Sequence, residues 1–299
     1  MSTVDESYLV GLIGDGITAS LSPPMHEREA REHGLLYLYR PIDVAALGFE
    51  GQQAQEEAAR LLDYGRRLGF NAFNITHPFK QTIMEHLDEV DEDARNLGAV
   101  NTVVFRNGRS VGHNTDYSGY ITGLKSTLAE PDLGSVVQIG AGGAGSAVAY
   151  ALLRAGARTL TLIDLDVERS AARAADLQAQ FPGQTVVARP HAELPECLAA
   201  ATGLAHCTPV GMHTHPGLPV EPAWLRPELW VSDVVYLPVE TELVRAARAL
   251  GCSVVDGGTM AVGQALDAFA LITGREADPA RVRGHFLELV AEKQTRRPT

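Results

Sequence analysis

The chain has 299 residues, enough for about two domains that each bury a core of their own. Asp and Glu outnumber Lys and Arg by 37 to 25, for a formal net charge of −12, and this balance disfavours a nucleic-acid binder, which neutralises phosphates with basic side chains. With 45% hydrophobic and 21% charged residues, the composition is that of a globular protein and excludes a disordered or collagen-like chain.

The cysteines and the apolar segments indicate where the protein works. Cys197, Cys207 and Cys252 cannot all pair and lack metal-ligand spacing, so a reducing cytoplasm is expected. Residues 133–153 carry no formal charge, but the glycines among them favour a buried strand, a turn and a buried helix over a membrane span. The first residues, MSTVDESY, lack the features of a signal peptide. We predict a cytoplasmic protein with no membrane partner and, because no histidine pair stands at helical spacing beside an acid, no metal site.

The first 118 residues alternate short apolar runs with longer segments of helical periodicity. Strands are expected over residues 8–13, 36–42, 70–76, 99–105 and 110–113, and helices over 24–33, 52–68, 78–87 and 92–97. Asn107-Gly108 is a strong hairpin signal between the last two strands. This alternation predicts an α/β domain with a largely parallel sheet.

A stricter α/β rhythm begins after a predicted helix over 116–128 and a break at Glu130-Pro131-Asp132. Strands are expected near residues 136–139, 159–163, 185–188, 204–207, 230–236 and 253–255, a number that suits a doubly wound Rossmann sheet. We therefore predict a first domain over 1–118 and a dinucleotide-binding domain over 119–264. The helices over 260–273 and 279–293 precede no strand, and residues 265–299 are expected to complete the first domain.

A glycine-rich loop joins the first strand of the second domain to a helix of small residues. Gly140-Ala141-Gly142-Gly143-Ala144-Gly145 matches the G-x-G-x-x-G pattern, whose glycines permit a tight turn, the approach of a pyrophosphate and close helix packing. The amides at the start of the helix then attract the phosphates. The alternative is a glycine-rich turn in an unrelated α/β domain.

Asp164 follows the second strand of this domain, 24 positions after Gly140. An acid near this position binds the adenosine ribose hydroxyls in NAD enzymes and repels a 2′-phosphate, so NAD is favoured over NADP. Arg169 lies close by in the sequence and can accommodate a phosphate. Asp166 either contacts the cofactor or caps the next helix.

Polar side chains also gather at the ends of strands in the first domain, where α/β folds bind ligands. Ser20 and Ser22 precede prolines that open a helix, so their hydroxyls and the helix end can hold a carboxylate. The alternative for Ser22 is a helix N-cap.

A second polar group comes from the segment Phe73–Lys80. An apolar strand delivers Asn74 and Thr76, and a helix predicted from Pro78 places Lys80 in its first turn, where a cation opposes the helix dipole and therefore hints at a function. Asn101 and Asp116 add polar groups at later strand ends, although Asp116 can equally cap the next helix.

These residues fall in segments through which the chain resembles the shikimate and quinate dehydrogenases, from about residue 8 to residue 290. The segments, in the family's order, are GLIGDGITASLSP, NITHPFK, GAVNTV, HNTDYSGY, GAGGAGSAVAYAL, TPVGMHTHPGLP, DVVYLPVETELVRAARALG and GGTMAVGQALDAF. The IDLD and HPFK sequences look most like the NAD-preferring quinate/shikimate branch, since NADP-dependent biosynthetic members usually carry Asn-Arg-Thr where this chain has Asp-Leu-Asp.

The resemblance implies roles for individual residues. Ser20 and Ser22 would bind the ring carboxylate, and Lys80 would be the proton acceptor, paired with Asp116. The ring hydroxyls would be held by Asn74, Thr76, Asn101, Asp116 and Gln264, and Tyr236 would touch the substrate. The cofactor positions are Gly140, Gly142, Gly143, Ala144, Asp164, Asp166, Arg169, Thr208, Pro209, Val210, Met212, Val235 and Gly257.

Two segments depart from the family's pattern. His206-Cys207-Thr208-Pro209-Val210 stands where relatives often have Asn-Ala-Thr-Pro-Met, on the nicotinamide side of the cofactor. Thr259 stands where many biosynthetic members have glycine, in the loop beside Gln264.

Together these features predict an NAD-dependent oxidoreductase that interconverts quinate and 3-dehydroquinate, shikimate and 3-dehydroshikimate, or both, in a cleft between the two domains. Its partners would be these small molecules and, in a homodimer, a second copy of the chain. The alternatives are an NADP-dependent biosynthetic shikimate dehydrogenase, an aminoshikimate-type dehydrogenase and a non-catalytic NAD-sensing regulator. Intact Lys80 and Asp116 argue against the regulator.

Overall fold

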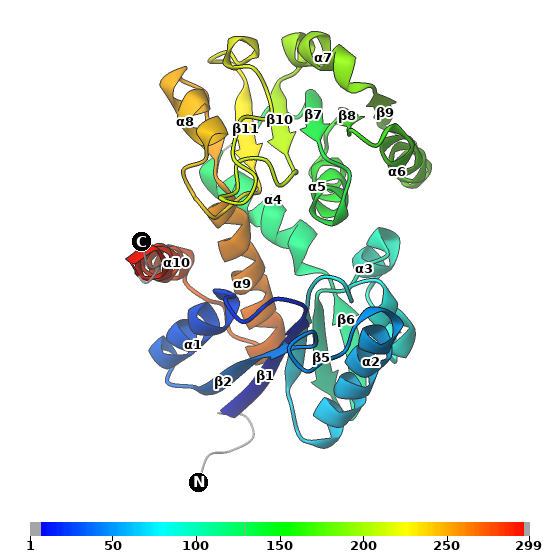
Figure 1. The fold of residues 1–299 in the computed structure, drawn as a ribbon, viewed down its shortest axis with the longest axis vertical. Helices are drawn as coiled ribbons and strands as arrows, with labels where there is room; N and C mark the ends of the chain where they lie inside the picture. Colours follow the sequence, from blue (N-terminus) through cyan, green and yellow to red (C-terminus); the bar gives the residue numbers. More distant parts are fainter. Residues whose placement is uncertain (1–6, 129, 296–299) are drawn as a thin grey trace. The chain divides into compact units, whose positions relative to one another are not determined.

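The fold was analysed in a computed structural model that describes residues 7–128 and 130–295. The ends of the predicted first domain, residues 1–6 and 296–299, lie outside these ranges. The chain forms two compact units: the residues up to Thr115 together with those from Ala265 on make the first, and Asp116–Gln264 make the second (Figure 1).

The first unit is built on a mixed six-stranded sheet in the order β2-β1-β3-β5-β6-β4. Its strands are β1 (Ser7–Gly14), β2 (Leu36–Asp43), β3 (Ala72–Ile75), β4 (Glu89–Val90), β5 (Thr102–Arg106) and β6 (Arg109–His113). β1 is parallel to β2 and β3, whereas β5 is antiparallel to both of its neighbours. The predicted hairpin is confirmed: Asn107 and Gly108 both have positive φ, as a two-residue type I′ turn requires. The two-residue β4 is too short to produce a periodic pattern and was not predicted.

Helices α1 (Ser22–Glu32), α2 (Gly51–Arg67) and α3 (Glu92–Leu97) and the 3-10 helix η2 (Thr82–His86) connect these strands. α2 buries Ala54, Ala58 and Leu62 at helical spacing. A Cβ on Gly65 of the same helix would lie 2.1 Å from Cε2 of Phe73, so glycine is what allows α2 to approach β3 this closely. In α3, Asp91 caps the helix by accepting a hydrogen bond from the Ala94 amide at 2.6 Å.

One alternative and one prediction on helix starts in the first unit are wrong. α1 begins at Ser22 with Leu21 at the N-cap position and no side-chain cap, so Ser22 is not the cap. The helix predicted from Pro78 begins only at Thr82, because the Phe79 amide donates to the Thr76 carbonyl in a turn and the Phe79 side chain is drawn into the core. Lys80 therefore precedes the helix, and the argument from an unfavourable helix dipole does not hold.

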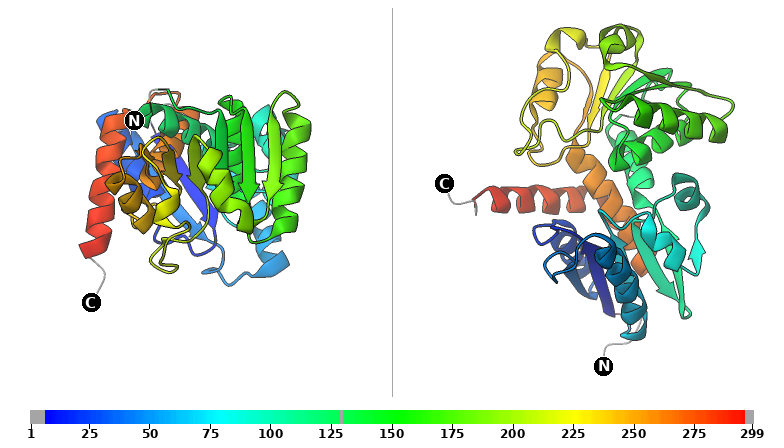
Figure 2. Two further views of the ribbon diagram at one scale, coloured as in Figure 1. Left: turned by 90° about the horizontal axis from the view of Figure 1, so that it is seen from above. Right: turned by 45° about the vertical axis from the view of Figure 1, so that its right-hand side comes forward.

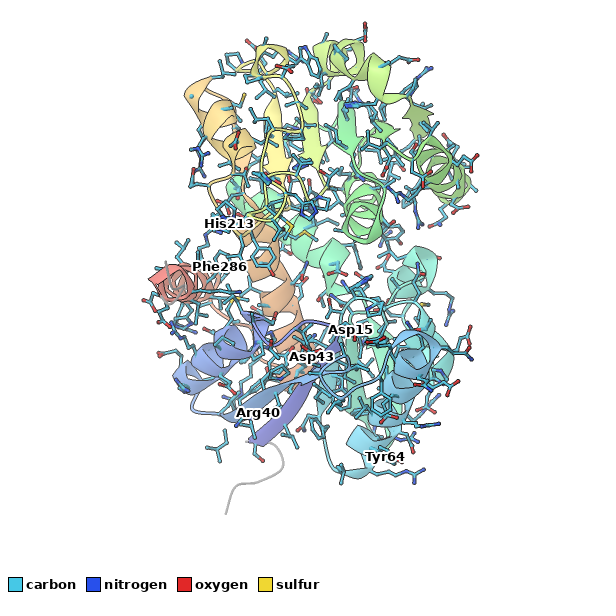
Figure 3. All side chains as sticks on the ribbon, in the orientation of Figure 1. Asp15, Arg40, Asp43, Tyr64, His213 and Phe286 are labelled. Carbon is cyan, nitrogen blue, oxygen red and sulfur yellow. The ribbon has the colours of Figure 1, made fainter. Side chains whose placement is uncertain are left out.

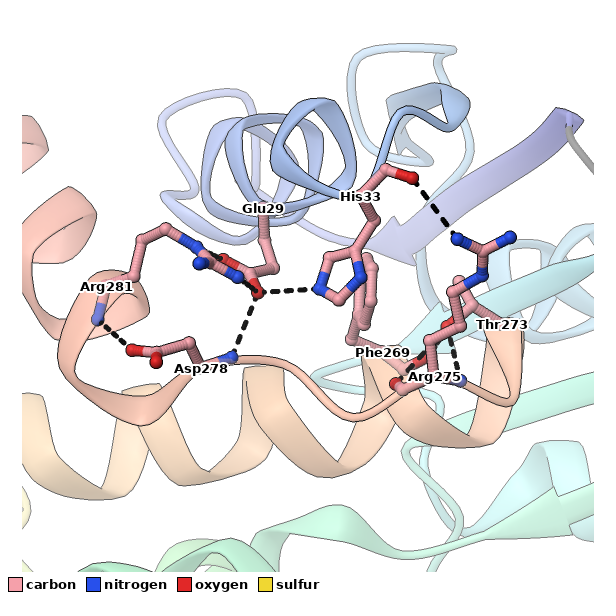
Figure 4. A network of polar contacts seen from close by, with 7 residues as sticks. All are labelled: Glu29, His33, Phe269, Thr273, Arg275, Asp278 and Arg281. Atoms are coloured by element: carbon pink, nitrogen blue, oxygen red, sulfur yellow. Dashed lines mark hydrogen bonds and ion pairs between the residues drawn. The ribbon is translucent and has the colours of Figure 1, made fainter.

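The C-terminal helix α10 (Pro279–Thr295) lies beside α1 within the first unit (Figure 2). The contact is made through Glu29 of α1, which binds the guanidinium of Arg281 and the amide of Asp278, in the network shown in Figure 4. Helix α9 (Gly257–Thr273) contributes Phe269 to a second contact with α1 and β2, against His26, His33 and Tyr37. Helices α9 and α10 thus pack against α1 within the first unit.

The second unit confirms the predicted doubly wound sheet. Its strands are β7 (Ser135–Ile139), β8 (Thr159–Ile163), β9 (Thr185–Arg189), β10 (Gly203–His206), β11 (Trp230–Asp233) and β12 (Val254–Val255), all parallel, in the order β12-β11-β10-β7-β8-β9. This is the strand order of a Rossmann fold. β11 ends earlier than predicted because the Val235 amide turns back to donate to the Asp233 carboxylate.

The second unit also contains the main part of α4 (Thr115–Thr127), the start of α9, and helices α5 (Gly143–Arg154), α6 (Val167–Gln180), α7 (Leu194–Ala200) and α8 (Glu242–Ala249), with short 3-10 helices η3 (His191–Glu193) and η4 (Pro222–Trp224). Among the helices in the described ranges, none combines the length and the hydropathy needed to cross a bilayer.

Candidate active and cofactor site

The glycine-rich loop has the geometry that a dinucleotide needs. Gly140 has a φ of +98°, and a Cβ there would lie 2.7 Å from the Cys207 carbonyl oxygen. A Cβ on Gly145 would lie 2.2 Å from the Gly140 carbonyl oxygen, so this glycine allows α5 to pack tightly on the loop. By contrast, a Cβ on Gly142 or Gly143 would meet nothing within 4 Å. The loop therefore leaves open space in front of these two residues, which a pyrophosphate can fill.

The start of α5 faces this open space without a side-chain cap. The N-cap residue is Gly142, which has no side chain to cap the helix. Gly143 and Ala144, at the start of the helix, are exposed. Amides in the first turn have no partner within a helix and carry the positive end of its dipole, so they suit phosphate oxygens. The residues present thus fit the phosphates of a dinucleotide.

Gln138 holds the two ends of the loop together, a role that the sequence patterns did not indicate. Its side chain is fully buried, and Nε2 donates to the carbonyl oxygens of Gly140 and Gly145, at 2.8 Å each. Gln138 stands out in the sequence as a polar residue within the uncharged stretch 133–153. Only the folded loop shows which groups it binds.

Asp164 lies directly after β8 and is 6% exposed. Its carboxylate accepts hydrogen bonds from the amides of Ala141, at 2.7 Å, and Asp166, at 2.9 Å. Arg169 also donates to it, through Nη2 at 2.6 Å and Nε at 3.3 Å. Burial alone would raise the pKa of Asp164, but these hydrogen bonds and the charge of Arg169 outweigh it and lower the pKa below its ordinary value. The carboxylate is therefore ionised at neutral pH.

Asp166 caps α6, since its side chain accepts a hydrogen bond from the Arg169 amide at 3.0 Å. The capping alternative from the sequence is thus confirmed, and a cofactor contact by this exposed residue stays a prediction. Arg169 is half exposed and spans both acids, with Nη1 3.8 Å from Asp166 Oδ2.

Five of the predicted cofactor positions follow the carboxyl ends of neighbouring strands. Gly140 and Asp164 come directly after β7 and β8, whereas Thr208, Val235 and Gly257 come two residues after β10, β11 and β12. Because these strands are parallel neighbours, the five positions lie along one edge of the sheet.

Close backbone contacts connect parts of this edge. A Cβ on Gly257 would lie 2.3 Å from the Val235 carbonyl oxygen. In the loop after β10, Val210 is half-buried, whereas Pro209 and Met212 are exposed. Tyr236, after β11, is 39% exposed.

Asp116 and Gln264 stand on two helices that cross closely within the second unit. A Cβ on Gly119 of α4 would lie 2.4 Å from the Gln264 amide nitrogen, and a Cβ on Gly263 of α9 would lie 2.2 Å from the Gly119 carbonyl oxygen. Asp116 is 8% exposed and lies in the first turn of α4, which begins at Thr115. The alternative that Asp116 caps this helix is therefore wrong.

In the first unit, a chain of hydrogen bonds crosses the sheet from β2 to the start of α4. Tyr39 donates to Oδ1 of Asn74 at 2.5 Å, and Nδ2 of Asn74 donates to Thr102 Oγ1 at 2.9 Å. Thr102 donates to Oδ1 of Asn101 at 3.0 Å, and Nδ2 of Asn101 donates to Thr115 Oγ1 at 3.0 Å. Strand register produces this order, because Asn74 pairs with Thr102 across β3 and β5.

The direction of these hydrogen bonds is set at the Tyr39 end. Burial raises the pKa of Tyr39 far above its ordinary value, so the phenol keeps its proton and donates to Asn74. The amide of Asn74 is thereby turned so that Nδ2 faces Thr102. The predicted site residues Asn74 and Asn101 are thus brought together. Tyr39 is the member of the chain of hydrogen bonds that the sequence patterns did not indicate.

Lys80 and Thr76 lie on the turn that follows β3. The backbone of Thr76 is held by β1, because its amide donates a hydrogen bond to the Ile13 carbonyl at 2.9 Å. The Lys80 carbonyl accepts a hydrogen bond from the Val100 amide at 2.8 Å, so the backbone of the half-buried lysine is held next to the segment that carries Asn101.

Ser20 lies on the loop between β1 and α1, which Asp43 holds, and Ser22 is the first residue of α1. The Asp43 carboxylate, at the end of β2, accepts hydrogen bonds from the amides of Gly16 and Ile17, at 3.0 Å each. Asp43 and Asp15, the residue that opens this loop, are labelled in Figure 3. The Ser22 amide donates to Ser20 Oγ at 3.3 Å, which brings the two serines together.

Comparisons with known proteins place these observations in a family. A model of the shikimate dehydrogenase substrate binding domain matches residues 12–103. A shikimate dehydrogenase (NADP(+)) of Pseudarthrobacter chlorophenolicus is 60% identical over 98% of this chain and 99% of its own. The chain belongs to the shikimate dehydrogenase family. The resemblance noted in the sequence is thereby confirmed.

Other members of the shikimate dehydrogenase family carry different cofactor names. A quinate/shikimate dehydrogenase (NAD(+)) of Corynebacterium glutamicum strain R is 47% identical over 96% of this chain and 100% of its own. The solved structure of a quinate dehydrogenase from Corynebacterium glutamicum in complex with NAD has a TM-score of 0.88 and 46% identity, covering 94% of this chain and 99% of that one. Relatives named for NADP and for NAD thus both match nearly the whole chain.

Proposed function

We propose that the protein is a dehydrogenase that oxidises a ring hydroxyl of quinate, shikimate or both, with NAD as the preferred cofactor and Lys80 as the general base. The proposal assigns the ring acid to the first unit and the dinucleotide to the second. Membership of the shikimate dehydrogenase family and the close relatives named for these substrates support it.

The first unit supplies groups of the kinds that a hydroxylated ring acid requires. Ser20 and Ser22 would bind the ring carboxylate, and Asn74, Thr76 and Asn101 would bind ring hydroxyls. The hydrogen-bonded chain from Tyr39 to Thr115 supports this assignment, because it fixes both asparagine amides before any ligand binds and so reduces the entropy lost on binding. Lys80 would take the proton that the ring hydroxyl loses.

The second unit would hold the dinucleotide at the edge formed by Gly140, Asp164, Thr208, Val235 and Gly257. When bound, the dinucleotide supplies the hydride acceptor of the reaction. Asp116, Gln264 and Tyr236 of the same unit would contact the ring acid. In this assignment Asp116 would pair with Lys80 and orient its amine.

The observation that carries the preference for NAD is the ionised Asp164 carboxylate at the end of β8. Ribose hydroxyls can donate to its oxygens, whereas a 2′-phosphate would bring negative charge toward a buried carboxylate. Arg169 partly offsets this repulsion, but its guanidinium is already engaged by Asp164. The competing proposal, an NADP enzyme, rests on the relative that is 60% identical and on release of Arg169 toward the phosphate.

Initial rates with quinate and shikimate, each with NAD and NADP, test the proposal. We expect kcat/KM to be at least about tenfold higher with NAD, a difference of about 1.4 kcal/mol in transition-state stabilisation. Lys80→Ala should lose nearly all turnover, whereas Lys125→Ala, at an exposed position on α4, should keep it. Faster turnover with NADP would overturn the cofactor assignment, and full activity of Lys80→Ala would overturn the base.

An aminoshikimate-type dehydrogenase and an NAD-sensing regulator would each give a different result in the same assay. Turnover only of a ring acid that carries an amine in place of a hydroxyl would indicate the aminoshikimate-type enzyme. Retained NAD binding with no turnover of any ring acid would indicate a sensing protein. A homodimer stays a prediction, which light scattering of the full-length chain tests.

A further inference from the structure

Behind the predicted cofactor residue Thr208 lies a buried pair of an imidazole and a carboxylate. His206 and Asp233 are the last residues of β10 and β11 and are paired across the two strands. Both side chains are 0% exposed, and Nδ1 of His206 lies 2.9 Å from Oδ1 of Asp233. On the other side of the ring, Nε2 lies 2.5 Å from Thr208 Oγ1.

The surroundings of Asp233 determine which ring nitrogen carries the proton. Its carboxylate also accepts hydrogen bonds from the Val235 amide, at 3.0 Å, and from the Thr241 hydroxyl, at 2.7 Å. An ionised carboxylate can only accept hydrogen bonds. Nδ1 of His206 must therefore carry a proton and donate it to Asp233. When the imidazole is neutral, the other nitrogen, Nε2, is an acceptor, and in that state Thr208 donates its hydroxyl proton to Nε2.

This arrangement fixes both the rotamer of Thr208 and the role of its oxygen. A Cβ on Gly140 would lie 2.9 Å from Cγ2 of Thr208, so the methyl group of Thr208 is held against the glycine-rich loop while the hydroxyl faces His206. Oγ1 also accepts a hydrogen bond from the Val210 amide at 3.3 Å. With a neutral imidazole the hydroxyl proton is used within the fold, and half-buried Thr208 then offers a ligand only an acceptor.

We propose that His206 is a positioning residue for the dinucleotide: together with Asp233 it holds Thr208 as a hydrogen-bond acceptor for an O–H or N–H group of the cofactor. The inference rests on the proposed function, since it takes the edge after β10 to be part of the dinucleotide site. It also gives a physical role to one of the two departures from the family's pattern, the His206-Cys207 sequence.

Two substitutions separate the two sides of the imidazole. In His206→Asn, the amide nitrogen takes the place of Nδ1 and can still donate to Asp233, but the side chain is too short to reach Thr208. In His206→Gln, the longer side chain restores a polar group near the position of Nε2. Thr208→Val removes the hydroxyl while keeping the shape of the side chain.

The experiment measures the Kd for NAD by calorimetry on the full-length protein, together with the KM for the ring acid and the thermal midpoint. His206→Asn should raise the Kd for NAD about tenfold, as expected for one lost hydrogen bond in the site, and leave the KM for the ring acid within about twofold. His206→Gln should restore binding to within about threefold. In the Thr208→Val background, His206→Asn should have no further effect on the Kd.

If the effects of His206→Asn and Thr208→Val on the Kd for NAD are additive, or if His206→Asn leaves that Kd unchanged, the proposal is overturned while the proposed function stays intact. If His206→Asn does not fold, a tenfold loss of affinity in folded His206→Gln overturns it equally. A wild-type protein that binds neither NAD nor NADP would instead refute the proposed function.

Discussion

Glu29 of α1 and Arg281 of α10 form a two-point ion pair, with Nε of Arg281 2.8 Å from Oε2 and Nη2 2.6 Å from Oε1 of Glu29. Oε1 also accepts a hydrogen bond from the Asp278 amide at 3.0 Å and lies 3.0 Å from Nε2 of His33. Burial alone would raise the pKa of Glu29, but these partners lower it below its ordinary value, so the carboxylate is ionised at neutral pH. One buried charge thus connects α1 to α10 (Figure 4).

Removing this charge should destabilise the first unit. Glu29→Gln leaves the Arg281 guanidinium without this counter-charge, and we expect the free energy of unfolding at pH 7 to fall by about 3 kcal/mol. The loss is not larger because Arg281 is itself partly exposed. Urea titration followed by circular dichroism measures the change. The matched control is Glu288→Gln, which removes an ion pair from α1 to α10 at a position where the glutamate is 67% exposed, and should cost less than about 1 kcal/mol. Equal losses in both variants would contradict the role of burial.

His26 makes the stability of the first unit dependent on pH. His26 belongs to α1, and its side chain is buried against Tyr37, Tyr39 and Phe269. This burial lowers the pKa of His26 from 6.5 to about 4. In the unfolded chain the imidazole takes up a proton near pH 6.5, whereas in the folded chain it does so only near pH 4. The unfolded state therefore binds more protons in this window, and the free energy of unfolding should fall by about 1.4 kcal/mol per pH unit as the pH drops from 6.5 toward 4.

Urea titrations at pH 7, 6 and 5 measure this dependence. They avoid more acidic conditions, because the partners of Glu29 hold its pKa below its ordinary value in the folded chain. His26→Phe should flatten the profile, and His191→Phe, at an exposed position, should leave the slope as it is. A wild-type profile without a slope between pH 6.5 and 5 would refute the assignment.

Tyr39 should affect binding of the ring acid without touching it. Tyr39→Phe removes the donor to Oδ1 of Asn74 and so frees the amide to rotate away from Thr102. We expect the KM for the ring acid to rise about fivefold, with a loss of about 1 kcal/mol in stability and no change in the Kd for NAD. Steady-state kinetics at saturating NAD measure the effect.

The control for Tyr39 is its neighbour Tyr37, whose hydroxyl lies 3.2 Å from Nδ1 of His26 and not on the chain that leads to Asn101. Tyr37→Phe should lose similar stability with no change in KM. If both variants change KM alike, the hydrogen-bonded chain does not orient the site.

The parts of the site that the sequence predicted are those determined by local patterns. The glycine-rich loop and Asp164 follow from spacing along one βαβ unit, because the turn, the helix start and the next strand end are connected by short segments. The hairpin at Asn107-Gly108 follows from two residues that tolerate positive φ.

The parts that the sequence did not predict depend on strand register or on burial. Tyr39 reaches Asn74 within the first sheet, and His206 reaches Asp233 within the second. No local sequence pattern indicates which residues meet across neighbouring strands. The sequence predicts Lys80 in a helix because Pro78 can begin one, but the Phe79 side chain is buried in the core, and the chain turns there instead.

The two acids after β8 allow a sharp test of cofactor choice. Asp164→Ala removes the carboxylate that would repel a 2′-phosphate and releases Arg169, whose guanidinium Asp164 now holds at 2.6 Å. If the proposed function holds, kcat/KM with NAD should fall about tenfold and kcat/KM with NADP should rise, because the freed guanidinium would bind the added phosphate. Asp166→Ala, two residues away, removes the cap of α6 and should cost about 1 kcal/mol of stability while the ratio of NAD to NADP efficiency stays within about threefold of wild type. A parallel fall with both cofactors in Asp164→Ala would mean that Asp164 maintains the loop through the Ala141 amide and does not select the cofactor.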